Sequence, residues 1–179
     1  MKNQDKIEKI LVNYKELCNY CDNFYKSIKR LYSSQMKCKR KCFKCCELHT
    51  VCALEAYFMC NYLDKNNINL KKEDLGSTYC ALLKNDECIL YPVRPLICRS
   101  HGVPMYFDNK NSILSSCIYN FKSVDWSCFP KNHVFDTYSV TQCLLKLNIA
   151  FCIATGNKKL INKRFTLKSL ILRKIPKFL

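Results

Sequence analysis

The sequence contains very little glycine and few acidic residues. Only three of its 179 residues are glycine, whereas fifteen are cysteine. Three widely scattered glycines do not build a glycine-rich phosphate loop, so that type of nucleotide site is excluded. Asp and Glu number 14 and are absent from Thr137 onward, while Lys and Arg number 30. The formal charge of +16 predicts attraction to nucleic acid or to an anionic membrane surface.

The sequence also lacks the usual signals for export and for membrane insertion. Residues 1–10 are dotted with charges and contain no apolar core, so no secretory signal is expected. The longest apolar stretch, residues 144–154, is interrupted by Lys146 and is too short to span a bilayer. We therefore predict a cytoplasmic protein without a transmembrane segment, whose thiols stay reduced. The odd number of cysteines also argues against a complete disulfide framework.

The spacing of apolar residues predicts one mainly helical domain with a cysteine-rich, metal-stapled irregular centre and at most a short β-hairpin. Apolar residues recur three and four positions apart over residues 7–31, which is typical of an amphipathic helix. Further helices are predicted at 50–63 and at 137–154, the latter ended by Gly156. A hairpin is expected around the polar turn 84–87. The single domain, residues 1–179, then comprises an N-terminal helix (1–35), a metal-binding core (36–121) and a helical, basic C-terminal region (137–179).

A dense group of cysteines at the start of this core has the spacing of metal ligands. Thiolates must come within ~2.3 Å of a shared ion, and Cys42-x-x-Cys45 provides the necessary tight turn. Ionised thiols that lie close together repel one another, and a bound cation removes that cost. The basic residues of 39–44, Arg40 among them, would further favour thiolates. The group is Cys38, Cys42, Cys45 and Cys46, and it is followed by Cys80, Cys88, Cys98 and Cys117.

The middle of the sequence resembles the YkgJ-like, or CxxCxxCC, family of zinc- or iron-chelating domains. The most specific part is Cys-x-x-Tyr-x-x-Arg-Pro-x-x-Cys-Arg, which runs from Cys88 to Arg99, and the resemblance ends in SCIYNF, which contains Cys117. One departure is that three residues, not two, separate Cys38 from Cys42. The resemblance implies that eight thiols form the metal-binding set: Cys38, Cys42, Cys45, Cys46, Cys80, Cys88, Cys98 and Cys117.

The implied cofactor is zinc or an iron–sulfur cluster. Eight thiols suffice for two tetrahedral zinc sites, or for one four-iron cluster with thiols left over, and the sequence does not divide them. A similar cysteine motif occurs in the flagellin lysine methylase, which implies a metal-dependent protein-modifying enzyme as an alternative. A further alternative is a basic zinc module that binds nucleic acid or an anionic surface through residues 158–179.

Four residues of the matched segment are predicted to lie beside the metal ligands. Arg94 and Arg99 flank Cys98 and are expected to hydrogen-bond ligand thiolates or a substrate anion. Tyr91 is expected either to donate to a sulfur or to pack beside the hairpin. His101 is expected either to replace a cysteine as zinc ligand or to cap its loop.

The other candidate side chains are given structural roles. Cys18 and Cys21 lie on the apolar stripe of the first helix, which places them in the core. Glu55 is expected on the surface of the second helix, although a lone carboxylate could also join a metal site. His49 and His133 have no ligand context. Core packing is predicted for Cys52, Cys60, Cys128, Cys143 and Cys152, with the first two as reserve ligands.

Overall fold

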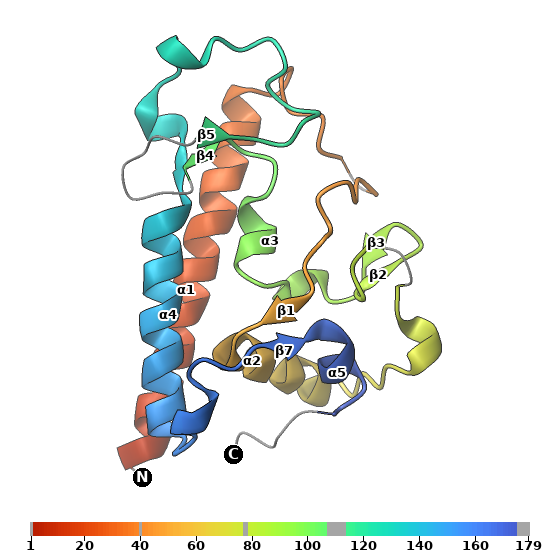
Figure 1. The fold of residues 1–179 in the computed structure, drawn as a ribbon, viewed down its shortest axis with the longest axis vertical. Helices are drawn as coiled ribbons and strands as arrows, with labels where there is room; N and C mark the ends of the chain where they lie inside the picture. Colours follow the sequence, from red (N-terminus) through yellow and green to blue (C-terminus); the bar gives the residue numbers. More distant parts are fainter. Residues whose placement is uncertain (1, 40, 77–78, 107–113, 175–179) are drawn as a thin grey trace.

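A computed structural model describes residues 2–39, 41–76, 79–106 and 114–174 as a mainly helical fold (Figure 1). Two long helices, α1 (Lys2–Leu31) and α4 (Thr137–Ala154), lie side by side and run in opposite directions. The predicted helical class is confirmed, and both long helices occur where the apolar spacing predicts them. Arg40 and residues 175–179 of the basic C-terminal region lie outside the described residues.

Shorter helices complete the architecture around this pair. Both α2 (Ala53–Lys65) and α1 contact α4, while α3 (Ile97–Ser100) packs against α1 and α5 (Leu167–Ile171) packs against α2. Single turns of 3-10 helix connect these elements: η1 (Lys72–Asp74), η2 (Tyr91–Val93), η3 (Trp126–Cys128), η4 (Lys131–His133) and η5 (Lys158–Leu160).

In the part of the chain that the structure describes, seven strands of two residues each form three small sheets. The predicted hairpin is present as β2 (Leu83–Lys84) and β3 (Glu87–Cys88), and its turn residues Asn85 and Asp86 both have positive φ, as a two-residue type I′ turn requires. The other two sheets were not predicted, because strands this short show no alternating pattern. They are β1 (Thr50–Val51) antiparallel to β7 (Phe165–Thr166), and β4 (Met105–Tyr106) between antiparallel β5 (Leu114–Ser115) and parallel β6 (Phe135–Asp136).

Strand β1 corrects the predicted start of the second helix. Thr50 and Val51 pair with Thr166 and Phe165 instead of opening α2, which begins at Ala53 after the N-cap residue Cys52. At the other long helix the prediction is accurate. The Asp136 side chain accepts from the Ser139 N–H to begin α4, and Gly156, at φ 72°, follows its end.

The core lies where α1, α2 and α4 meet. Tyr14, Ile28 and Leu54 are completely or almost completely buried there, and the predicted burial of Cys18 and Cys21 is confirmed. These residues recur along one face of each helix, so apolar burial alone accounts for their packing.

A separate aromatic cluster lies at the C-terminal end of α1. The Tyr32 ring packs against Phe121, Phe129 and His133, and Trp126 packs against both phenylalanines. The Tyr32 hydroxyl and His133 Nδ1 share a hydrogen bond of 2.7 Å. This contact confirms the structural role predicted for His133, and the cluster holds residues 120–121 close to the cysteine-rich segment.

Helix α4 is long and apolar enough, by length and composition alone, to cross a membrane. In this structure 28% of that helix is buried, and it packs along α1 and α2. The expectation that the chain has no transmembrane segment stays a prediction.

Candidate metal centre

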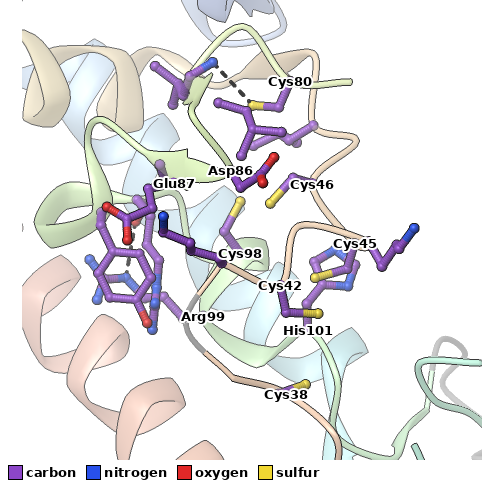
Figure 2. Close-up of a pocket in the computed structure, with 18 of the residues that line it drawn as sticks. Cys38, Cys42, Cys45, Cys46, Cys80, Asp86, Glu87, Cys98, Arg99 and His101 are labelled. Carbon is purple, nitrogen blue, oxygen red and sulfur yellow. Dashed lines mark hydrogen bonds between the residues drawn. The ribbon is translucent and has the colours of Figure 1, made fainter. Parts of the chain in front are cut away.

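The eight cysteines implied by the resemblance all line one open cavity of about 570 Å³ (Figure 2). They come from four separate parts of the chain: residues 38–46, the β2–β3 region, α3 and the loop after β5. All fifteen cysteines of the chain are free thiols, and the other seven lie away from this cavity. Tertiary structure has therefore gathered the thiols that the sequence pattern singled out.

The first four of these thiols lie on two successive backbone turns. The Cys42 N–H donates to the Lys39 carbonyl, and the Cys46 N–H donates to the Phe43 carbonyl. Lys41 between the two turns has φ 65°, a left-handed conformation that reverses the chain. The turns direct Cys42, Cys45 and Cys46 toward the cavity, whose lining includes all three.

Cys38 is held in the cavity wall by a buried amide. Asn120 Nδ2 donates to Cys38 Sγ at 3.2 Å and to the Gly102 carbonyl at 2.7 Å, while its Oδ1 accepts from the Lys37 N–H. Gly102 has φ +100°, and a Cβ there would lie 2.9 Å from Cys38 Sγ, so only glycine allows this approach. The extra residue between Cys38 and Cys42 therefore does not remove Cys38 from the set.

Three of the other thiols accept hydrogen bonds from the backbone two residues later. The Leu82 N–H donates to Cys80 Sγ at 3.5 Å, and the Leu90 and Tyr119 N–H groups likewise donate to Cys88 and Cys117. Such donors favour the thiolate over the thiol, which lowers the pKa of each sulfur against the opposing effect of burial. Because metals bind the thiolate, these contacts suit a ligand role.

Cys98 is positioned by two carboxylates that belong to other helices. Asp22 of α1 accepts from Arg94 Nη2 at 2.8 Å and from Arg99 Nη1 at 2.6 Å. Arg99 also donates to the carbonyls of Pro92 and Arg94, so it ties α3 to the segment that precedes Cys98. The sequence predicted thiolate or substrate partners for the arginines, whereas their hydrogen bonds go to Asp22 and to the backbone.

Glu55 is the second of these carboxylates, and its predicted surface location is wrong. The side chain is 3% exposed, and its two oxygens accept from the N–H groups of Cys52 and Leu96 at 3.3 and 3.0 Å. One contact caps α2, and the other holds the residue that precedes α3. Glu55 therefore joins α2 to the segment that carries Cys98.

The thiols make each other harder to ionise. Burial raises the pKa of Cys98 to about 12, with Cys80 and Cys88 adding to the rise. Burial, reinforced by Cys38, Cys45 and Cys42, also raises the pKa of Cys117. Cys46 is the exception, because a hydrogen bond from the Cys45 thiol lowers its pKa. Several thiolates cannot coexist here without a compensating positive charge.

Basic side chains provide part of that charge. The cavity lining includes four lysines, together with Arg94 and Arg99. Tyr91 is exposed, and the Arg94 guanidinium lies over its ring, with 4.1 Å between the guanidinium carbon and the ring centroid. His101 is half-buried in the wall directly after α3, and burial lowers its pKa although Glu47 opposes the effect. The lysines are Lys29, Lys39, Lys41 and Lys44.

The donor set fits a thiophilic metal in kind, although the ligand geometry is not already formed. Among the described residues, no three His, Cys, Asp or Glu side chains lie close enough together to hold an ion as they stand. Thiols are nevertheless the donors that zinc and iron–sulfur clusters prefer, and eight of them face the same space.

The remaining cysteines divide between core and surface. Cys52, Cys60 and Cys152 are buried, as predicted, whereas Cys128 and Cys143 are exposed, so their predicted core packing is wrong. Cys143 faces outward because only one side of α4 is covered by α1 and α2. The lining of the cavity includes neither Cys52 nor Cys60, so the reserve-ligand role for this pair has no geometric support.

Sequence reasoning did not assign Asp22, Glu55 or Asn120 to the site. Glu55 carries a weak signal, since it lies at the third helical position where a capping box places an acid. Asn120 lies inside the matched SCIYNF segment, and Asp22 is the last acid before a long basic run. Their distant partners Leu96, Arg99 and Cys38 lie 41, 77 and 82 residues away along the chain, and no local pattern reveals them.

Searches of family models, curated proteins and solved structures found no match to this chain. The resemblance to the YkgJ-like family therefore stays a prediction that rests on the quoted residues.

Proposed function

We propose that this protein binds metal through clustered thiolates, as zinc or as an iron–sulfur centre. One observation carries the proposal: eight thiols from four chain segments line a single cavity, and seven other thiols do not. The backbone and Asn120 N–H groups that point at these sulfurs add support, because they stabilise thiolates. A bound cation would compensate the mutual repulsion of the thiolates and would staple the irregular centre to α1 and α2.

A metal-dependent protein-modifying enzyme is the second candidate. The cavity of about 570 Å³ is larger than a closed structural site needs and lies within the ~300–1,000 Å³ typical of small-molecule pockets. Its lysines and arginines suit an anionic substrate group. The nucleic-acid alternative has less support, because Arg164 and Arg173 of the basic region bind Thr50 and Asp64 within the chain.

Metal analysis of the purified protein tests the proposal. We expect protein purified without oxygen to contain either zinc, with no visible colour, or iron and acid-labile sulfide, with broad visible absorbance. Alanine at Cys45 or at Cys98 should lower the metal content and the melting temperature, since both thiols line the cavity. Alanine at the exposed Cys143 is the matched control and should leave both unchanged. Metal-free wild type, or a Cys98→Ala variant with full metal content, would contradict the proposal.

A further inference from the structure

Four of the eight thiols form a mutually interacting group beside the β2–β3 hairpin. The hairpin brings Cys80 and Cys88 together, because the Leu83 N–H donates to the Cys80 carbonyl and Leu83 pairs with Cys88 across the two strands. Cys46 and Cys98 line the same cavity, and their electrostatic coupling to Cys80 and Cys88 supports the grouping. Figure 2 shows the sulfurs of Cys46 and Cys98 close to each other, with Asp86 and then Cys80 beyond them.

The other four thiols gather around Asn120 and His101. Cys117 interacts electrostatically with Cys38, Cys42 and Cys45. The Asn120 N–H donates to the Cys117 carbonyl, and its side chain donates to Cys38 Sγ, so one residue holds two of the four together. In Figure 2, Cys42 and Cys45 lie beside His101, away from Cys80 and toward Cys38.

The two groups meet at neighbouring residues of one turn. Cys45 and Cys46 are consecutive residues of the turn that the bond from the Cys46 N–H to the Phe43 carbonyl closes. In Figure 2 the Cys46 sulfur points toward Cys98, whereas the Cys45 sulfur lies beside His101.

We infer that the eight thiols form two separate four-thiol metal sites that share the Cys45–Cys46 peptide. Cys46, Cys80, Cys88 and Cys98 form the hairpin site, and Cys38, Cys42, Cys45 and Cys117 form the Asn120 site. This division rests on the proposed metal binding and goes beyond it, because the sequence leaves the eight thiols undivided. Each site has the full complement of ligands for one tetrahedral zinc ion or for one four-iron cluster.

Of the residues that the structure describes, six cationic side chains and only two acidic ones, Asp86 and Glu87, line the cavity, which suits thiolate-rich sites. Four thiolates around one divalent ion carry a net charge of about −2, which calls for cations nearby. Arg94 interacts with Cys88 and Cys98 of the hairpin site. Lys39, Lys41 and Lys44 lie along the turns that carry Cys42 and Cys45, which belong to the Asn120 site.

Metal titration combined with alkylation of individual cysteines tests the division. The full chain, reduced and freed of metal, is titrated with Zn²⁺, and the bound ions are counted by native mass spectrometry. N-ethylmaleimide labelling then reports which thiols the ion protects, because a metal-bound thiolate reacts slowly. The variants are Cys88→Ser for the hairpin site, Cys117→Ser for the Asn120 site and the exposed Cys143→Ser as control.

We expect two ions in the wild type and in Cys143→Ser, and one ion in each site variant. In Cys88→Ser, alkylation should increase at Cys46, Cys80 and Cys98 while Cys38, Cys42 and Cys117 stay protected, and Cys117→Ser should show the reverse. Loss of protection at all the remaining thiols in either variant would refute the division while leaving metal binding intact. A single ion or cluster that protects thiols of both groups would also refute the division. Wild type that takes up no metal would refute the proposed function itself.

Circular dichroism of each variant separates the loss of a ligand from unfolding of the chain. The variant Asn120→Ala keeps all eight thiols and should weaken Zn²⁺ binding at the Asn120 site alone.

Discussion

The helical part of the molecule and its cysteine-rich centre are held together in different ways. In α1, α2 and α4 most of the buried side chains are apolar and recur along one helix face, with Glu55, Thr137 and Asn148 as buried polar exceptions. Among the described residues between Cys38 and Phe121 the only helix longer than four residues is α2, and the segments that carry the eight thiols contain elements of two to four residues. Three polar side chains, Asp22, Glu55 and Asn120, anchor those segments.

This comparison shows why a bound metal would matter in only one of the two regions. Burial of apolar side chains stabilises the helices without any further cross-link. The centre buries apolar side chains such as Leu90 and Val103 as well, but its elements are short and surround an open cavity, so polar contacts help to hold its segments. Ligand bonds would add cross-links between these short elements.

The largest expected effect comes from the helical part. Leu54 of α2 is completely buried, and Leu54→Ala should lower the free energy of unfolding by about 3 kcal/mol, with or without metal. Leu145→Ala on the exposed side of α4 is the matched control and should cost little. Denaturant unfolding measures both, and a loss below about 1 kcal/mol for Leu54→Ala would show that α2 does not belong to the central core.

A smaller and more local effect is expected at Asp22. Asp22→Asn removes the partner of Arg94 and Arg99, and since the carboxylate is partly exposed we expect a loss of about 2 kcal/mol, below that for a fully buried pair. Hydrogen exchange should accelerate at the amides of α3 while α4 keeps its protection.

The matched control for Asp22 is Asp64→Asn. Asp64 pairs with Arg173 at the surface, so its loss should cost about 0.5 kcal/mol or less. Equal losses of unfolding free energy in the two variants would contradict a special role for Asp22 in holding the cysteine-rich centre. Faster hydrogen exchange throughout the molecule in Asp22→Asn would contradict it as well.

The effect that is smallest near neutral pH, and grows only in alkali, comes from a buried thiol in the core of the helical part. Burial, with a further contribution from Cys18, raises the pKa of Cys21 to about 12. The unfolded thiol ionises at about pH 8.5, so the stabilising contribution of the neutral thiol is complete below that pH and declines as the pH rises toward 12. The difference in unfolding free energy between wild type and Cys21→Ala should therefore shrink above pH 9, by up to about 1.4 kcal/mol per pH unit. Denaturant unfolding between pH 7.5 and 10.5 measures it, and a difference that stays constant would contradict the burial of this thiol.

Prediction from sequence succeeded where the signal is local. The apolar spacing of α1 and α4 and the polar turn of the β2–β3 hairpin each lie within one short segment, and each element formed as predicted. Prediction failed where a partner lies elsewhere in the chain. Glu55 looks like a surface residue until Leu96 is known to pack over it, and Cys143 looks buried until α4 is known to be covered on one side only.

Periodicity and short cysteine spacings are properties of neighbouring residues, so the long helices and the group from Cys38 to Cys46 could be read from the chain alone, whereas the full set of eight thiols was implied by the resemblance. The tertiary structure was needed to show that these thiols line one cavity and that Asp22, Glu55 and Asn120 hold the segments around it. It also joins Cys38 to Cys117 through Asn120, one of the contacts on which the proposed division rests. The reason is physical: each of these contacts forms across tens of residues, at positions that depend on how the helices pack and not on any local pattern.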